Sequence, residues 1–441
     1  MNNKKKVTVF GMGYVGLTLA LTLAKKKFQV LGIEKNEKIL KKLQSSKPHF
    51  YENGLTKLLK AYHKKNLLFS NDVKKIPKDC KIFIVAVGTP LNKNKKPDLK
   101  HLINITKKLK NILSANDTIV FRSTVPIGTI DNDLIPILKN KNINVCYCPE
   151  RTAQGNALKE LVNLNQIISG INRKSCLVAK KLFQSVTNKI QIVKNIKTAE
   201  AIKLVDNTQR DTFFSYANEI SNICTKLNIS SREILEYASK DYPRTKKIFP
   251  GPVGGPCLSK DTYLLLSSSK LNSYRKNSLI LKSRSINENI YQSFFKLIKM
   301  KKFKYLFSKK KTLKILLSGI AFKGNPITDD IRGSISLDIA KKLKEQFKKP
   351  KIFCYDPYVD ENILKKNNLL KIKNFDTKNF DIVINCSNNL YFKKIFKKII
   401  NRMNKNSVIY DFWSVINKSS KILNYKKSIL LFNYGSETNL I

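Results

Sequence analysis

The sequence predicts an α/β protein in which two doubly wound, parallel-sheet domains are joined by a helical middle domain with one long helix. Short apolar runs alternate with helical patterns over residues 6–195 and again over residues 312–441, which is typical of parallel sheets covered by helices. The region in between contains few strand candidates. We therefore expect domains at residues 1–195, 196–300 and 310–441, a division that suits a total of 441 residues.

The first domain is expected to start with a strand, a glycine turn and a helix. The strand covers Val7–Phe10 and the helix covers Leu17–Lys26. Further strands are expected at Gln29–Ile33, Lys81–Val87, Thr118–Arg122 and Asn144–Cys148, with Lys-rich helices between them. Because each helix returns the chain to the start of the next strand, these strands are expected to run parallel.

The middle domain is expected to be built on one helix over Thr198–Leu227. This segment has no Pro or Gly and carries apolar residues at helical spacing, which predicts ~8 turns and a length of ~45 Å. A helix of this length often bridges two domains or forms the core of a dimer. A glycine- and proline-rich segment, Pro250–Pro256, interrupts the remainder of this domain.

The last domain repeats the alternation of strands and helices. Its strands are expected at Leu313–Leu317, Pro350–Tyr355, Asp381–Cys386 and Ser407–Phe412. The basic stretch Lys299–Lys311 is expected to be the linker that precedes it.

The net charge of +53 suggests a nucleic-acid or anionic-membrane partner at first sight. However, 74 of the 84 basic residues are Lys and only 10 are Arg, and they are spread over the whole length. A surface that follows phosphates usually concentrates its charge and relies on Arg. A solvated Lys coat is therefore the favoured interpretation, and it would still attract an anionic substrate.

Composition also limits the compartment and the metal chemistry. No apolar run approaches the ~18–20 residues of a membrane-spanning helix, and the N-terminus leads directly into a strand pattern without a signal-peptide core. The eight cysteines form no C-x-x-C pair, and three His are too few for the usual zinc patterns. We expect a cytoplasmic protein with no membrane partner, no metal site and mostly buried, inert thiols.

A G-x-G-x-x-G motif follows the first strand and opens the first helix. Its glycines are Gly11, Gly13 and Gly16, and Glu34 ends the next strand 18 residues later. The glycines allow a tight turn and a close approach of a pyrophosphate to the helix N-terminus, and the acidic residue can accept hydrogen bonds from ribose hydroxyls. The motif predicts a Rossmann-like nucleotide site, and the carboxylate favours NAD over NADP.

Polar residues follow three of the predicted strands in this domain. Thr89, Thr124 and Glu150 each come shortly after a strand. The carboxyl ends of the strands in a doubly wound sheet form the ligand crevice, so together these residues indicate a site. Each one alone would more often be a turn former or a helix cap.

Two further groups of residues are candidates for chemistry. Lys203, Asn207 and Asn218 share one face of the long helix, although this pattern alone favours a solvated polar stripe. Cys257 lies in a glycine- and proline-rich loop with Lys260 and Asp261 within four residues. A neighbouring cation favours the thiolate, but a structural cysteine in a turn fits this local pattern equally well.

Together these segments resemble the UDP-glucose/GDP-mannose dehydrogenases, the nucleotide-sugar 6-dehydrogenases, over nearly the whole chain. The resemblance is carried by GMGYVG, VGTP, STVPIGT, the PER segment, AEAIKLVDNTQRDTFFSYANE, GGPCLSKD, and SGIAFKGNPITDDIRGS with YDP after it. It implies an N-terminal NAD domain, a helical middle domain that forms a homodimer, and a C-terminal domain that binds the nucleotide sugar. It also implies a four-electron oxidation of the sugar C6 alcohol to a uronic acid, for polysaccharide biosynthesis.

The resemblance also implies roles for individual residues. Cys257 would capture the aldehyde as a thiohemiacetal that is oxidised to a thioester. Lys203 and Asn207 would stabilise oxyanions and contact substrate, and Asp261 would act as the general-base element. Thr124 and Glu150 would position or activate water. The remaining implied contacts are with substrate for Glu150, Gly254 and Lys323, and with NAD for Gly11, Gly13, Tyr14, Val15, Gly16, Glu34, Thr89, Thr124, Lys260 and Arg332.

The sequence leaves the sugar open between UDP-glucose, UDP-N-acetylmannosamine and UDP-N-acetylglucosamine. Pro149-Glu150-Arg151 and Pro250-Gly251-Pro252 are similar to members that act on N-acetylhexosamines, whereas Lys260-Asp261 is similar to the glucose and mannose members. Gln154-Gly155 stands where Glu-Gly is usual.

Two other functions are compatible with parts of the sequence. A hydroxyacid dehydrogenase of the 6-phosphogluconate type would share the Rossmann-like start and the helical middle, but would not need Cys257 or a second α/β domain. A basic nucleic-acid-binding protein would show steeply salt-dependent binding and no NADH production.

Overall fold

The computed structural model describes residues 5–139, 141–301, 303, 307, 310–373, 379–416, 429–435 and 439–440. The chain divides into two compact units. The first contains residues 1–207 and 260–276, and the second contains residues 208–259 and 277–441. The three-domain division expected from the sequence stays a prediction.

The first unit is built on an eight-stranded sheet of order β3-β2-β1-β4-β5-β6-β7-β8, in which only the β6–β7 pair is antiparallel. The strands are β1 (Lys6–Phe10), β2 (Gln29–Ile33), β3 (Leu67–Ser70), β4 (Ile82–Val85), β5 (Thr118–Phe121), β6 (Asn144–Tyr147), β7 (Gln166–Gly170) and β8 (Ile190–Ile192). The chain order reverses between β1 and β4, and a doubly wound sheet binds its ligands at such a reversal.

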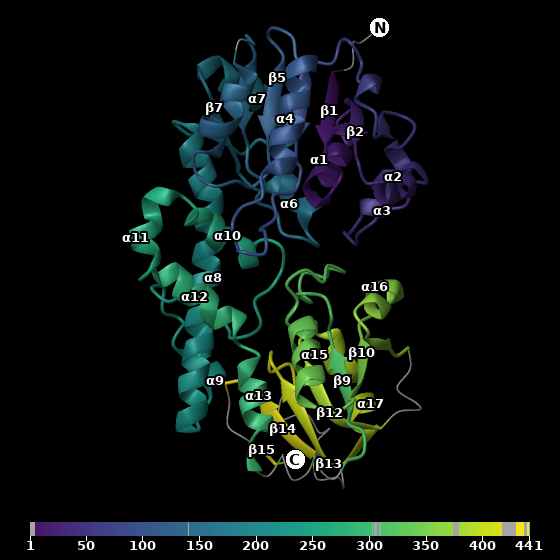
Figure 1. The fold of residues 1–441 in the computed structure, drawn as a ribbon, viewed down its shortest axis with the longest axis vertical. Coiled ribbons are helices and arrows are strands. Elements are labelled where there is room, and N and C mark those ends of the chain that lie inside the picture. The colour runs from purple at the N-terminus through teal and green to yellow at the C-terminus, as the bar shows by residue number, and fades with distance from the viewer. Residues whose placement is uncertain are drawn as a thin grey trace. The chain divides into compact units, whose positions relative to one another are not determined.

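Helices cover both faces of this sheet because successive strand residues point to opposite sides. Val7 and Val9 pack into one apolar cluster with helix α1 (Tyr14–Lys25), and Phe10 packs into the other with helix α4 (Lys100–Ile112). Figure 1 shows α1 and α4 alongside the strands. The remaining helical segments are α2 (Glu37–Gln44), α3 (Leu55–Tyr62), η1 (Val73–Lys75), η2 (Ile130–Leu134), α5 (Ile135–Leu138), α6 (Ala157–Asn163), α7 (Arg173–Phe183), α10 (Leu258–Leu265), η3 (Ser269–Leu271) and α11 (Asn272–Arg275).

Helix α8 (Ile196–Leu227) is a single helix of 32 residues. It contains no Gly or Pro that would interrupt it, and it starts two residues before the segment expected from the sequence. Two other helices of the middle region, α9 (Ser231–Tyr237) and α12 (Leu279–Glu288), belong to the second unit.

The second unit contains a seven-stranded sheet of order β11-β10-β9-β12-β13-β14-β15, parallel except for the β14–β15 pair. Its strands are β9 (Lys314–Ser318), β10 (Lys351–Tyr355), β11 (Leu370–Lys371), β12 (Phe380–Asn385), β13 (Met403–Asp411), β14 (Ile429–Asn433) and β15 (Asn439–Leu440). Helices α13 (Gln292–Ile298), α15 (Ile335–Gln346) and α16 (Glu361–Lys366) contribute to one apolar cluster, and α17 (Tyr391–Ile400) contributes to the other.

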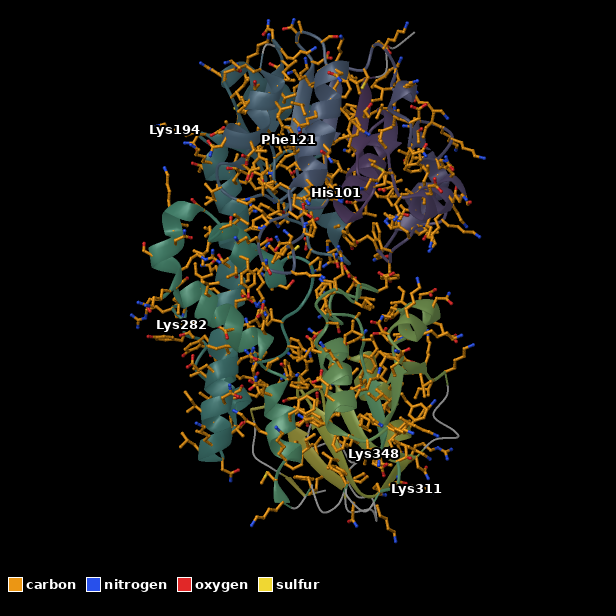
Figure 2. All side chains as sticks on the ribbon, viewed as in Figure 1. His101, Phe121, Lys194, Lys282, Lys311 and Lys348 are labelled. Carbon is orange, nitrogen blue, oxygen red and sulfur yellow. The ribbon has the colours of Figure 1, made fainter. Side chains whose placement is uncertain are left out.

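These two sheets confirm the predicted fold class. Each strand that we expected from the sequence is present. Most ends shift by one or two residues, and β13 starts four residues before the expected Ser407. The linker expected over 299–311 lies partly outside the described residues. In the part of the chain that the structure describes, no helix combines the length and the apolar character needed to cross a bilayer. Figure 2 labels four lysines, Lys194, Lys282, Lys311 and Lys348, which are all exposed and illustrate the Lys coat.

Candidate active site

The turn between β1 and α1 has the geometry of a phosphate cradle. Gly11 has a φ of +87°, which L-residues rarely adopt, and a Cβ on Gly16 would lie 1.8 Å from the Gly11 carbonyl oxygen. A Cβ on Gly13 would meet no atom within 4 Å. Gly13 caps α1 without a side-chain hydrogen bond, so the first amides of this 12-residue helix remain open to an anion.

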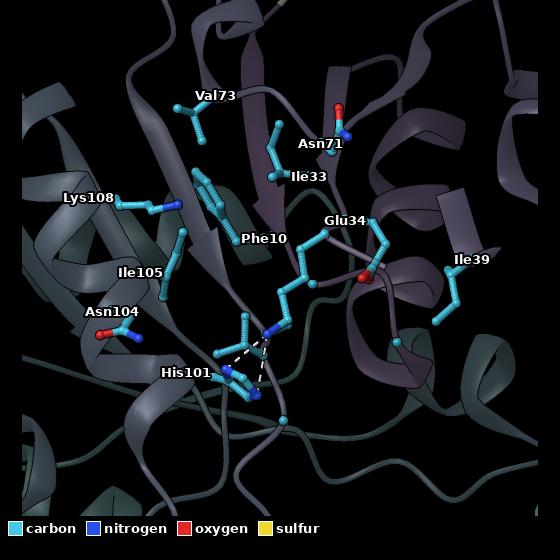
Figure 3. A pocket seen from close by; sticks show the side chains of 16 residues that line it. Phe10, Ile33, Glu34, Ile39, Asn71, Val73, His101, Asn104, Ile105 and Lys108 are labelled. Atoms are coloured by element: carbon cyan, nitrogen blue, oxygen red, sulfur yellow. Dashed lines mark hydrogen bonds between the residues drawn. The ribbon is translucent and has the colours of Figure 1, made fainter. Parts of the chain in front are cut away.

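A pocket of about 520 Å³ lies beside this turn (Figure 3). It is lined by Phe10, Gly11, Gly13, Ile33, Glu34, Lys35, Ile39, Asn71, Val73, Ala86, Val87, Gly88, His101, Asn104, Ile105 and Lys108. The apolar side chains among them suit a flat aromatic base, and the glycine turn suits a pyrophosphate. The pocket therefore fits the adenosine part of NAD.

Glu34 is fixed at this pocket by two backbone amides. Its Oε2 accepts a hydrogen bond from Met12 N at 2.9 Å, and its Oε1 accepts one from Asn36 N at 2.8 Å. Each carboxylate oxygen can accept a further hydrogen bond, so ribose hydroxyls can still bind there. The neighbouring Lys35 is held by α4 instead, because its Nζ lies 3.1 Å from Nδ1 of His101 (Figure 3).

Tyr14 and Val15 are the first residues of α1, and both are half-buried. The Tyr14 hydroxyl accepts a hydrogen bond from Gly155 N at 2.6 Å, and its ring stacks on Phe50. Gly155 N also donates to Oε2 of Glu52, at 2.7 Å. The loop that contains the unusual Gln154-Gly155 pair is thus hydrogen-bonded to the first residue of α1, the helix whose N-terminus borders the nucleotide site.

The loops after β4 and β5 are joined by two hydrogen bonds. Oγ1 of Thr89 donates to the Thr124 carbonyl at 2.5 Å, and Oγ of Ser123 donates to the Val87 carbonyl at 2.6 Å. The Thr89 hydroxyl therefore positions the backbone of Thr124.

Glu150 follows β6 and forms a buried ion pair with Arg122, which follows β5. Its other oxygen accepts hydrogen bonds from Arg151 N and Thr152 N. Burial opposes ionisation, but the Arg122 charge and these donors outweigh it, with a further contribution from Lys203, so the pKa of Glu150 lies below its usual value. Glu150 is an ionised carboxylate that can orient water.

A second buried carboxylate holds the STVPIGT loop. Glu200 of α8 accepts hydrogen bonds from Gly128 N at 2.5 Å and Ile130 N at 3.0 Å. Burial raises the pKa of Glu200 to about 7, against the opposing effect of these two amides. The loop that carries Thr124 is therefore anchored to the long helix.

Four of the expected catalytic or cofactor residues form one cluster in the first unit. Oδ2 of Asp261 accepts from Asn207 Nδ2 at 2.6 Å, and Oδ1 accepts from Lys260 Nζ at 2.8 Å. Lys203 lies one turn before Asn207 on α8, and its charge acts on Glu150. Lys203, Asn207 and Asp261 are all buried, so this polar face of the long helix is not a solvated stripe.

Cys257 is the one exposed thiol among the eight cysteines, all of which lie in the described residues. It immediately precedes the eight-residue helix α10, in a loop rich in Gly and Pro residues. By contrast, burial raises the pKa of Cys148, Cys354 and Cys386 to about 12. The chain thus offers a single thiol in a setting suited to nucleophilic chemistry.

The loop before Cys257 packs against the segment after β9, within the second unit. A Cβ on Gly254 would lie 2.1 Å from the Gly333 carbonyl oxygen, and a Cβ on Gly255 would lie 2.5 Å from the Phe322 ring. The Lys323 ammonium lies 5.5 Å from the centre of that ring. Only glycines allow this approach, which brings the expected substrate residues Gly254 and Lys323 together.

Arg332 belongs to the same segment and pairs with Asp330 at 2.5 Å. Burial opposes its charge, but the Asp330 carboxylate outweighs burial and Cys257 adds to the effect, so the pKa of Arg332 is raised. Arg332 is therefore associated with the Cys257 loop, and the cofactor contact that the resemblance implies stays a prediction.

Sequence reasoning missed three groups that hold these residues: Arg122, Glu200 and the pair Asp211–Arg284. Arg122 directly precedes the STVP motif, which is a local signal. Glu200 and Asp211 lie on the same helix as Lys203, but their partners lie far away in the sequence, so no local pattern identifies them.

Three consecutive regions of the chain match the domains of one family. Residues 5–187 match the NAD binding domain of the UDP-glucose/GDP-mannose dehydrogenase family, residues 197–289 its central domain, and residues 316–418 its UDP binding domain.

Individual relatives agree with this match over nearly their full length. The UDP-N-acetyl-D-mannosamine dehydrogenase of Methanocaldococcus jannaschii is 33% identical and covers 94% of this chain and 93% of its own. The UDP-N-acetyl-D-glucosamine 6-dehydrogenase of Salmonella typhi is 30% identical and covers 92% of this chain and 95% of its own. The solved structure of the UDP-D-ManNAc dehydrogenase from Pyrococcus horikoshii superposes with a TM-score of 0.82 at 28% identity. The superposition covers 98% of this chain and 99% of that one. With an NAD-binding turn, a buried Lys–Asn–Asp cluster and one exposed cysteine, the chain belongs to the UDP-glucose/GDP-mannose dehydrogenase family of NAD-dependent oxidoreductases.

Proposed function

We propose that this protein oxidises the C6 alcohol of a UDP-N-acetylhexosamine to the uronic acid, and that its preferred substrate is UDP-N-acetylmannosamine. The observation that carries the proposal is Cys257, an exposed thiol in a glycine loop at the start of α10, three residues before Lys260. A simple alcohol dehydrogenase needs no such thiol, whereas a four-electron oxidation needs a group that retains the aldehyde.

The proposed reaction consists of two oxidations and a hydrolysis. NAD held at the Gly11–Gly16 turn and Glu34 would supply the hydride acceptor for each of two oxidations, so two NAD would be consumed. The alcohol loses a hydride and a proton and becomes an aldehyde. Sγ of Cys257 then forms a bond to the aldehyde carbon, and the thiohemiacetal loses a second hydride and proton to become a thioester. Water adds to the thioester, the C–S bond breaks, and the acid and the free thiol are released.

The buried cluster of the first unit supplies charge and proton acceptance. The Lys203 ammonium and the Asn207 amide are suited to stabilise the oxyanions that form at C6. Asp261, which accepts hydrogen bonds from Asn207 and Lys260, is suited to take a proton through water. Glu150 and Thr124 would orient the water that releases the acid.

In the second unit, the loop around Gly254 and the side chain of Lys323 would contact the nucleotide sugar. Arg332 carries a positive charge beside the Cys257 loop. The family's UDP binding domain matches this unit, which supports a uridine nucleotide.

The named relatives favour an N-acetylated sugar over glucose. The test is NADH production with UDP-N-acetylmannosamine, UDP-N-acetylglucosamine, UDP-glucose and GDP-mannose in parallel. We expect the highest kcat/KM with UDP-N-acetylmannosamine. Higher efficiency with UDP-glucose would overturn the sugar assignment, and no NADH with any of the four would overturn the function.

We also propose a homodimer formed through the long helix. Tyr216, Ile223 and Leu227 are exposed at 59%, 46% and 63%, and their spacings of 7 and 4 put them on one face of α8. Sedimentation should give a dimer for the wild type and a monomer for Tyr216→Asp/Ile223→Asp. Eight unpaired cysteines suit the reducing cytoplasm, where we place this activity.

A further inference from the structure

The loop that carries Cys257 has few side chains of its own with which to hold its shape. Residues 250–256 consist of Gly and Pro apart from Val253. Its backbone is instead held from outside, at points before and after the cysteine. Asn218 of α8 accepts from Gly251 N at 2.8 Å and donates to the Gly251 carbonyl at 3.1 Å.

Arg284 of α12 holds the other side of the loop. Its Nη2 donates to the Val253 carbonyl at 3.2 Å, and its Nη1 donates to the Leu258 carbonyl at 3.1 Å. These two carbonyls flank Cys257 in the sequence, so a single guanidinium spans the segment that contains the thiol.

These two anchors are connected by a closed chain of buried polar groups. Arg284 Nη1 pairs with Asp211 Oδ1 at 2.8 Å. Nδ2 of Asn287 donates to the same Asp211 oxygen at 2.8 Å, and Oδ1 of Asn287 accepts from Asn218 Nδ2 at 2.9 Å. All four side chains are at most 2% exposed.

Stability alone is a weak reason to bury such a network. Replacing a buried ion pair with apolar side chains of similar volume is often neutral or stabilising. A planar guanidinium, however, fixes two carbonyls at a set distance, which an apolar side chain cannot do. The network suits a need for geometric precision at the loop.

We propose that Asp211, Asn218, Arg284 and Asn287 form a positioning network that fixes Sγ of Cys257 for attack on the aldehyde. The proposal rests on the proposed function, because it assigns the network to the cysteine-dependent half of that reaction. Alcohol oxidation, the first half, needs no thiol and should be affected much less.

The test uses the double variant Asp211→Asn/Arg284→Met, which leaves no unpaired buried charge, and the milder Arg284→Lys. Lys282→Met is the matched control, because it removes a positive charge from the exposed face of the same helix (Figure 2). Each enzyme is given NAD, UDP-N-acetylmannosamine and a carbonyl-trapping reagent, and both NADH and trapped aldehyde are measured.

We expect the double variant to form acid roughly 10²-fold more slowly, as a displacement of about 1 Å can cause, to release aldehyde, and to yield fewer than two NADH per sugar. The rate of acid formation by Arg284→Lys should lie between those of the double variant and the wild type, and the rate for Lys282→Met should equal that of the wild type. If the double variant is slower but still yields two NADH per sugar without free aldehyde, the network is merely structural and the proposal is overturned.

A second measurement does not depend on the substrate. Hydrogen exchange of the amides in residues 250–258 should be faster in Arg284→Lys than in Lys282→Met, above all at Gly251. Unchanged exchange there would overturn the positioning role. A wild type that makes no NADH would overturn the proposed function and the catalytic purpose of the network, while the exchange data would still show whether the network holds the loop.

Discussion

At the scale of single residues, the chemistry depends on which side chains are buried and which are exposed. Cys257 is exposed at the start of a helix, whereas the other seven thiols are buried. The polar residues that we propose to act with Cys257 show the opposite pattern, since Lys203, Asn207 and Asp261 are all buried. A buried polar cluster holds its charges in fixed positions, and an exposed thiol can reach a substrate carbon.

Cys257→Ala should abolish acid formation while leaving the affinity for NAD unchanged. The thiol acts on the aldehyde and not on the bound ground state, so the loss should appear in kcat rather than in binding. Acid is measured by chromatography and NAD binding by calorimetry. Cys224→Ala, which removes a buried thiol from α8, serves as the control, and near wild-type acid formation by Cys257→Ala would refute the covalent route.

Glu34→Ala should relax the preference for NAD over NADP. The Glu34 carboxylate, held by Met12 N and Asn36 N, repels a 2′-phosphate and accepts hydrogen bonds from the ribose of NAD. The readout is the ratio of kcat/KM for the two cofactors. Equal wild-type efficiency with both would mean that Lys35 outweighs Glu34.

Glu200 makes stability depend on pH in a defined window. Its pKa is about 7 in the folded protein and near 4.5 when unfolded, chiefly because of burial and despite the nearby Lys197. The folded state therefore binds the extra proton between these values, and stability falls as the pH rises from about 4.5 to about 7, by up to about 3 kcal/mol.

Glu200→Gln lacks this titration. The difference in unfolding free energy, variant minus wild type, should increase with pH across that window and remain level above pH 7. Chemical denaturation at several pH values measures it. A difference that does not change with pH would show that Glu200 titrates alike in both states.

At the scale of elements, the turn between β1 and α1 contains one glycine that is needed for folding and another that is needed for cofactor binding. Gly16 is required by packing, because its Cβ would overlap the Gly11 carbonyl. Gly13 has no such neighbour and has a φ of −68°, which any residue adopts. The two glycines of one motif therefore have different roles.

Gly13→Ala should keep the thermal stability of the wild type but weaken NAD binding by at least roughly tenfold, because the methyl group would occupy the phosphate cradle. Gly16→Ala should lower stability by roughly 1–3 kcal/mol, since backbone must move. Thermal denaturation and calorimetric NAD titration measure the pair. Wild-type NAD affinity in Gly13→Ala would place the pyrophosphate elsewhere.

Local sequence patterns predicted most elements but not all contacts. Gln29–Ile33 was predicted with the bounds of β2, whereas β3 (Leu67–Ser70) and β7 (Gln166–Gly170) were missed because short apolar runs do not distinguish strand from helix. Motifs located Cys257, Lys203 and Asp261. They could not locate the Glu200–Gly128 contact, which joins residues 72 positions apart.

At the scale of the whole molecule, we expect the charge of +53 and the covalent chemistry to act on the same anionic substrate. An exposed Lys coat attracts a doubly charged nucleotide sugar over a long range, and this attraction weakens with salt. After binding, the outcome depends on whether the aldehyde is captured before it escapes. The number of NADH formed per sugar reports on this capture for the complete enzyme.

The most direct test of the account is therefore the stoichiometry of the complete reaction with limiting UDP-N-acetylmannosamine and excess NAD. Capture of the aldehyde by Cys257 predicts two NADH for each sugar consumed, uronic acid as the product, and no aldehyde in a carbonyl-trapping assay. One NADH per sugar, with free aldehyde as the product, would contradict it.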